Sequence, residues 1–255
     1  GLLTCFMVAD DIDIMTSSKE QELANSISLR KVNGNYLLQK IEKNKLDNRI
    51  KDHGTMVKLY VRPDVDMESL ERDLKKWIVL PEIPVYLTFN DKDESRIGYD
   101  NLKDILIKYL EETGCHVDGK QYDVYEIEQG NVTVAYAVSR FKYMKDWNLL
   151  NANTYRTNKG KMQMPIGTCV EGIRVEFSTP GYKGNSILAI ANIKNSEYQT
   201  NVARSAIELD AHDKVLSDIY DVYQTYIQTE MDQLEEQGYS SAWAVEEGHY
   251  LMRSL

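Results

Sequence analysis

The chain has 255 residues, of which 42% are apolar, so it is long enough for two domains and apolar enough to bury a core. Its 40 acidic and 30 basic residues give a net charge of −10, which argues against a general nucleic-acid-binding protein, because attraction to phosphates needs a positive face. Three cysteines without a CxxC pair form no disulfide framework, and they fit a reducing, cytoplasmic compartment.

The composition also gives no reason to expect a metal site or a membrane span. The four histidines, His53, His116, His212 and His249, show no metal-ligand spacing. No apolar run approaches the roughly 20 residues that a helix needs to cross a bilayer. We therefore expect no metal ligands in this chain and no membrane partner.

The first residues, Leu2 to Ala9, predict a helix that is already under way where the chain begins. Because Gly1 is not a start methionine, we expect the chain to be a fragment whose first part is missing. An alternating strand follows, with Ile12 and Ile14 on one face.

The next stretch predicts strands and one helix. Residues 27–41 predict a β-hairpin, since Asn33-Gly34 at its centre suits the positive φ of a type I′ turn. Residues 55–62 alternate as a strand does, Asp66 is placed to cap a helix that ends before Pro81, and residues 85–89 form another short strand. The polar stretch that follows predicts a domain boundary, which divides the chain into residues 1–91 and 92–255.

The second domain mixes the same element types in a different order. We expect a helix over 102–110, strands over 122–127, 132–138, 170–177 and 187–191, and a long amphipathic helix from Asp213 to about Gly238. Residues 140–166 are too long for a structureless connection and predict some helix or a functional loop. The fold class is therefore α/β or α+β.

The loop Gln199-Thr200-Asn201-Val202-Ala203-Arg204-Ser205 lies between the last strand and the long helix. Arginine stays charged at any workable pH, and its planar fork matches a phosphate. Arg204 is thus well placed to reach an anion on a neighbouring domain. The alternative is an ordinary surface arginine in a connecting loop.

Four short motifs in the same order carry a resemblance to a known family. The chain opens with a glycine and a helix that ends in Val8-Ala9-Asp10, and a Gly54-Thr55 strand and an Asn201-Val202-Ala203-Arg204 loop follow. In these motifs, and in the acidic stretch and helix after the Gly-Thr strand, it resembles a divergent, bacterial-type member of the heat-shock protein 90 family. These proteins are ATP-dependent molecular chaperones of the GHKL ATPase superfamily.

The resemblance implies a fold and a set of site residues. The first domain would be the C-terminal part of a GHKL-type ATPase sandwich, with helices on one face of a mixed sheet, and the second a βαβ-type middle (transducer) domain. Gly1 and Leu2 would lie at the phosphate end of the nucleotide pocket. Thr55 would place its hydroxyl near the adenine, although threonine is also an ordinary residue at a strand start. Arg204 would reach the γ-phosphate as the catalytic arginine, with Asn201 either supporting its loop or capping a local turn.

Two departures from the family pattern limit this correspondence. Ser205 follows the arginine where the family usually has glutamate, and Glu208 stands where it has a glutamine, which would bring an acid close to the γ-phosphate. The catalytic glutamate, the magnesium-binding asparagine and the Asp-x-Gly-x-Gly motif of the family have no counterpart in this chain. We therefore expect ATP and Mg²⁺ as cofactors of a full-length parent ATPase, and neither tight ATP binding nor hydrolysis by this polypeptide.

The partners implied are client proteins, without nucleic acid, and a homodimer of the parent is left open. An alternative class is a DNA-acting GHKL ATPase of the mismatch-repair or topoisomerase kind, since Gln199-Thr200 faintly resembles a topoisomerase Gln-Thr-Lys loop; here, however, the lysine position holds Asn201. A third is a non-enzymatic interaction module that uses the aromatic helix with Tyr220, Tyr223 and Tyr226. Apolar stripes at helical spacing usually face the core, which favours packing for these tyrosines.

Overall fold

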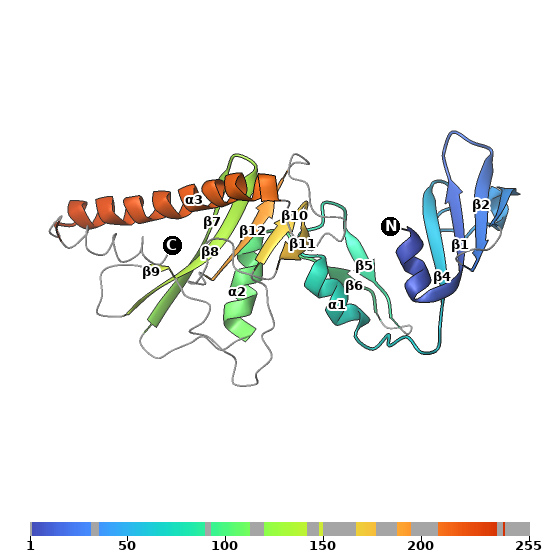
Figure 1. The fold of residues 1–255 in the computed structure, drawn as a ribbon, viewed down its shortest axis with the longest axis horizontal. Coiled ribbons are helices and arrows are strands. Elements are labelled where there is room, and N and C mark those ends of the chain that lie inside the picture. Colours follow the sequence, from blue (N-terminus) through green and yellow to red (C-terminus); the bar gives the residue numbers. More distant parts are fainter. Residues whose placement is uncertain are drawn as a thin grey trace. The chain divides into compact units, whose positions relative to one another are not determined.

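The computed structural model describes residues 2–31, 36–89, 93–112, 120–141, 148–149, 167–176, 188–194, 209–238 and 242. The chain divides into two compact units, Gly1–Ser69 and Leu70–Leu255. Figure 1 shows the elements of both. The mixed α/β architecture expected from the sequence is confirmed.

The first unit is built on one sheet with the strand order β3-β2-β1-β4. Its elements are the 3₁₀ helices η1 (Leu2–Met7) and η2 (Lys43–Lys45) and the strands β1 (Ala9–Ser17), β2 (Leu23–Arg30), β3 (Tyr36–Glu42) and β4 (Gly54–Val61). All three strand pairings are antiparallel. The prediction of a mixed sheet was therefore wrong for the described residues of this unit. The predicted hairpin is confirmed by the pairing of β2 with β3, while its Asn33-Gly34 turn lies outside the described residues.

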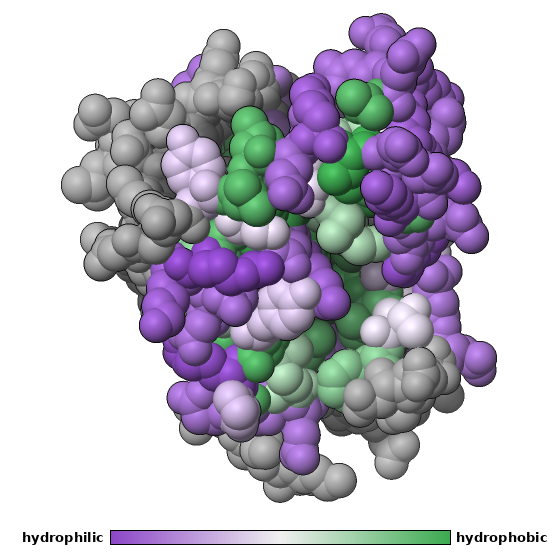
Figure 2. Space-filling model, turned by 90° about the vertical axis from the view of Figure 1, so that its right-hand side faces the viewer, coloured by the Kyte–Doolittle hydropathy of each residue, from purple (hydrophilic) through white to green (hydrophobic). Residues whose placement is uncertain are grey.

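The two faces of this sheet differ in what covers them. Side chains alternate between faces along a strand, and one face carries Ala24, Met15, Ile41 and Met56, on which Leu46 and Ile50 of the β3–β4 connection pack. The opposite face, which we call the Thr55 face, carries Ile14 and Thr16 of β1 beside Val57 and Thr55 of β4. Tyr36, Leu38 and Val57 on this face are exposed by 72%, 60% and 50%. Figure 2 shows hydrophobic side chains, in green, reaching the surface between hydrophilic ones.

The second unit has a sheet with helices on both faces. The strand order is β11-β10-β12-β8-β7, and β9 also pairs with β8. The elements are α1 (Leu70–Trp77), β5 (Val85–Leu87), β6 (Ser95–Ile97), α2 (Leu102–Glu112), β7 (Lys120–Gln129), β8 (Val132–Phe141), β9 (Asn148–Leu149), β10 (Gly167–Val170), β11 (Ile173–Glu176), β12 (Ala189–Ile193) and α3 (Leu209–Glu236). Among the described strands only β10 and β12 pair in parallel.

Successive side chains of β8 and β12 point to opposite faces of the sheet. This alternation explains why the sheet forms the middle of three layers, with α3 on one face and α2 on the other. Val134 and Tyr136 of β8 and Ala191 of β12 join a buried cluster with α3, whereas Ala135 of β8 and Ile190 of β12 join a second cluster with α2. A central strand that is buried on both faces reads as a nearly continuous apolar run, as this sequence does. Tyr223 and Tyr226 of α3 lie in the first cluster, so packing explains them better than partner binding does.

Two details of the second unit differ from expectation. The strand expected over 170–177 is found only from Ile173, as β11, and it forms a hairpin with β10, a strand that was not expected. Glu171 and Gly172 at the turn have positive φ values of 49° and 75°. The unit boundary falls after Ser69 and not at residue 91, because α1 contacts β11 and because Val79 and Leu80 both donate backbone hydrogen bonds to the Gly172 carbonyl. Long-range contacts of this kind leave no mark in local sequence.

Candidate functional site

The candidate site is the Thr55 face of the first unit. Thr55 lies at the start of β4 with an exposed side chain, and Leu2 lies in η1, which contacts β1. Gly1, Asn201 and Arg204, together with Ser205 and Glu208, lie outside the described residues. Their roles therefore remain predictions.

Thr55 has a partner that sequence reasoning missed. Thr16 stands opposite Thr55 in the β1–β4 register, and the two hydroxyl oxygens lie 2.9 Å apart. The Thr16 hydroxyl also donates to the Gly54 carbonyl at 3.4 Å. Thirty-nine residues separate the two threonines in sequence, so only the strand register brings them together.

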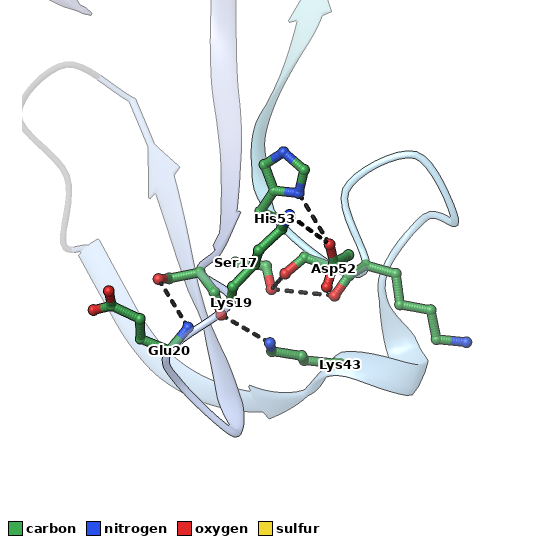
Figure 3. A network of polar contacts seen from close by, with 8 residues as sticks. Ser17, Lys19, Glu20, Lys43, Asp52 and His53 are labelled. Carbon is green, nitrogen blue, oxygen red and sulfur yellow. Dashed lines mark hydrogen bonds and ion pairs between the residues drawn. The ribbon is translucent and has the colours of Figure 1, made fainter.

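The backbone around Gly54 is fixed by the loop that precedes it. Gly54 has a φ of 134°, and a Cβ at this position would lie 3.1 Å from a methyl carbon of Ile50. Ser17 Oγ donates to the carbonyls of Lys51 and Asp52 at 3.2 and 3.4 Å, which ties the end of β1 to this loop (Figure 3).

Charged side chains join the same loop to the β1–β2 turn (Figure 3). Lys43 Nζ donates to the Ser18 carbonyl at 2.8 Å, and Lys19 Nζ lies 3.5 Å from a carboxylate oxygen of Asp52. The His53 ring lies 3.2 Å from the same carboxylate, and this hydrogen bond is the main reason why the pKa of Asp52 is lowered. Lys19, Asp52 and His53 are exposed, so we expect their ion pairs to orient the loop more than to stabilise it.

The other face of the same sheet holds a polar network centred on Asp13. Its carboxylate accepts hydrogen bonds from Ser28 at 2.7 Å and Tyr60 at 2.9 Å, and it pairs with Arg30 at 2.8 Å. Burial of Asp13 acts to raise its pKa, but these hydrogen bonds outweigh burial and lower it. Both oxygens of the carboxylate have partners, and these partners lie on β2 and β4. The network therefore joins β1, β2 and β4, which is a structural role.

Neither a metal centre nor a membrane helix emerges from the described part of the chain. No group of three or more His, Cys, Asp or Glu side chains among the described residues is arranged to hold a metal ion. None of the described helices has the length and apolar character that a membrane crossing requires.

The fold has counterparts among solved structures. The B-subunit of the DNA gyrase from Myxococcus xanthus matches 89% of this chain and 70% of its own, with a TM-score of 0.53 and 7% identity. The topoisomerase IV ATP-binding domain of Francisella tularensis, in complex with a small-molecule inhibitor, matches 98% of this chain and 71% of its own, with a TM-score of 0.52 and 9% identity. No protein-family model matches the sequence, and no curated protein is similar to it.

These likenesses show the fold alone: this chain has the fold of GHKL-type ATPase domains. They do not single out the heat-shock protein 90 family, because the two matched proteins are a DNA gyrase subunit and a topoisomerase IV domain. The Thr55 face places the hydroxyls of Thr16 and Thr55 beside the apolar side chains of Ile14 and Val57.

Proposed function

We propose that this chain is part of an ATP-dependent molecular machine, in which the Thr55 face is one wall of the nucleotide site. The observation that carries the proposal is the exposed Thr16–Thr55 hydroxyl pair beside Ile14 and Val57, on a fold shared with an ATP-binding domain. Ile14 and Val57 suit the face of a base, and the hydroxyls suit its polar edge.

In this proposal the second unit contributes the catalytic cation, which is the guanidinium of Arg204. Bound ATP would supply a phosphoanhydride bond, whose hydrolysis would drive a cycle of conformational changes. Arg204 would neutralise negative charge that develops on the terminal phosphoryl group, Asn201 would support its loop, and Gly1 and Leu2 would offer backbone N–H groups to the phosphates. No group of three or more potential metal ligands is found among the described residues, and the Mg²⁺ that would accompany ATP is assigned in this proposal to the full-length protein.

The machine we favour is a chaperone that acts on client proteins in the cytoplasm. A net charge of −10 gives the chain no general attraction for nucleic acid. The Asn201 to Arg204 motif, with asparagine and not lysine at its first position, agrees with the heat-shock protein 90 pattern.

A second candidate, a DNA-acting ATPase, is favoured by the fold likeness to gyrase and topoisomerase IV components. Binding of the full-length protein to duplex DNA would separate the two. A DNA-acting protein would bind with an affinity that falls steeply as salt rises. A chaperone would instead suppress aggregation of an unfolded client in an ATP-dependent manner.

The catalytic role is tested by ATP turnover of the full-length protein carrying Arg204→Ala. We expect turnover to fall by on the order of 10³, the effect of arginines that stabilise phosphoryl transfer. Arg72→Ala is the matched control, because Arg72 is an exposed arginine in an ion pair with Asp73 on α1. Turnover by Arg204→Ala within about threefold of wild type, or ~0.7 kcal/mol, would remove Arg204 from the mechanism.

A further inference from the structure

Strand β12 is apolar and buried along its whole length except for one polar residue, Asn192. A buried amide is costly unless it is hydrogen-bonded, so a polar side chain in such a strand calls for a physical reason. The Asn192 side-chain oxygen accepts a buried hydrogen bond of 2.9 Å from the backbone N–H of Gly172. Gly172 lies at the turn where β10 leaves its parallel pairing with β12, so the amide oxygen serves as an acceptor that the pairing no longer supplies.

The Gly172 peptide also holds the segment that follows α1. Its carbonyl oxygen accepts hydrogen bonds from the backbone N–H groups of Val79 and Leu80, at 3.0 and 2.9 Å, while its own N–H donates to Asn192. One amide in β12 therefore holds the β10–β11 turn, and that turn holds residues 79–80.

The same end of β12 is where the chain leaves the sheet toward Arg204. Backbone hydrogen bonds hold this end from both neighbouring strands. On one side the Glu171 N–H donates to the Ile193 carbonyl at 3.0 Å, and on the other the Lys194 N–H donates to the Asn131 carbonyl at 2.7 Å. The last described residue before the arginine motif is thus part of a fixed frame, as a catalytic side chain that must be held in a precise position requires.

We propose that Asn192 is a positioning residue for Arg204: by holding the β10–β11 turn against the end of β12, it fixes the point from which the arginine motif leaves the sheet. Asn192 touches no part of the nucleotide in this proposal and affects turnover through Arg204. The inference rests on the proposed function, since it assigns a support to the same catalytic arginine.

The inference is tested by ATP turnover of the full-length protein carrying Asn192→Leu, which keeps the size of the side chain and removes its acceptor oxygen. We expect kcat to fall roughly tenfold, because a displacement of ~1 Å at a catalytic group costs up to about 10²-fold in rate. KM for ATP should stay within about twofold of wild type, since an arginine that acts in the transition state leaves ground-state binding unchanged. Asn192→Asp, which keeps an acceptor oxygen at this position, should restore kcat.

A purely structural role for Asn192 predicts a different result when Arg204 is absent. If Asn192 acts through Arg204, Asn192→Leu lowers turnover in the wild-type background and lowers it no further in Arg204→Ala, where no arginine is left to position. A structural role lowers turnover by the same factor in both backgrounds. Equal losses would therefore overturn the inference, and so would an unchanged kcat in Asn192→Leu.

Thr133→Val is the matched control. Thr133 is buried and lies opposite Asn192 in the β8–β12 register, but its hydroxyl has no hydrogen-bond partner among the residues that the structure describes. We expect its kcat to equal that of wild type, because valine keeps the shape of the side chain. If Asn192→Leu does not fold, Asn192→Ser takes its place, since the serine side chain is too short to reach the Gly172 N–H.

The outcomes separate the inference from the proposed function. Wild-type full-length protein that hydrolyses no ATP would overturn both, and so would normal turnover by Arg204→Ala. Hydrolysis that is lost in Arg204→Ala, with kcat unchanged in the Asn192 variants, would overturn the inference alone.

Discussion

Tyr60 on β4 and Asp13 on β1 are joined across the first sheet by a hydrogen bond of 2.9 Å from the Tyr60 hydroxyl to the Asp13 carboxylate. The same carboxylate accepts from Ser28 and pairs with Arg30 on β2, so one buried acid holds three strands. Tyr60 in turn lies beneath two cations, with Lys58 Nζ 4.7 Å and the Arg30 guanidinium 5.8 Å from the ring centroid. The network stabilises the sheet that carries the Thr55 face.

Asp13→Asn should destabilise the first unit by roughly 1–3 kcal/mol, because hydrogen bonds to a charged acceptor are lost or weakened. The folded-state pKa of Asp13 is lowered. Its stabilisation is therefore fully present above the unfolded value of about 3.9 and is lost as pH falls through the lower folded value. Hydrogen exchange of the β1 and β4 amides, measured between pH 7 and acid, should show this loss in wild type and not in Asp13→Asn.

Asp47→Asn is the control for that experiment. The pKa of Asp47 is lowered to about 2, chiefly by its hydrogen bond from Arg49, but the Arg49 side chain is exposed and solvent screens the pair. We expect exchange in β1 and β4 to stay close to wild type. If both substitutions changed hydrogen exchange in β1 and β4 equally, the Asp13 network would stabilise the sheet no more than an exposed ion pair does.

Gly172→Ala should destabilise the second unit by at least ~2 kcal/mol. Gly172 has a φ of 75°, and an added Cβ would lie 1.8 Å from the Leu80 carbonyl oxygen, so both backbone strain and overlap oppose alanine. Gly130→Ala shares the positive φ of 58° but meets no atom within 4 Å, so only the backbone cost of roughly 1 kcal/mol remains. Urea unfolding followed by tryptophan fluorescence reports this unit, which holds Trp77, Trp147 and Trp243. Equal losses in both variants would contradict the close packing of residues 79–81 on the β10–β11 turn.

Ile219→Ala should cost roughly 2–5 kcal/mol of unfolding free energy, because Ile219 of α3 is fully buried against the sheet and its truncation leaves a cavity. Ile83→Ala, at a side chain that is 78% exposed, should change stability by less than ~0.5 kcal/mol. The same urea titration measures both. A small effect at Ile219 would mean that α3 is not packed on this face.

Cys169 should resist alkylation in the folded protein at pH 8. Burial raises the pKa of its thiol to about 11, which outweighs the influence of Arg174, and the side chain is closed to reagents. Cys5, which is only half-buried, should react first. Iodoacetamide labelling followed by peptide mass spectrometry distinguishes the two sites, and urea should make Cys169 reactive. Rapid native labelling of Cys169 would contradict its place beneath α2.

The resemblance carried by the sequence motifs predicted a GHKL-type fold, and the fold is confirmed. Local glycine and alternation signals placed Thr55 at a strand start and found the β2–β3 hairpin. The same signals missed Thr16 and Asp13, since a hydroxyl or a carboxylate in an alternating strand looks like any other polar residue. They also missed β10 and included the turn at Gly172 in the strand that is β11, because the pairing of β10 with β11 and β12 is not visible in local sequence.

The sequence by itself determined the element types and their faces, because strand and helix periodicities are set by neighbours a few residues away. It also determined the net negative charge, which argues against general nucleic-acid binding. Only the tertiary structure decided that Thr16 meets Thr55, that Asp13 joins three strands, and that α1 belongs with the second unit. Those facts depend on strand register and on packing between segments far apart in the chain, which no local pattern encodes.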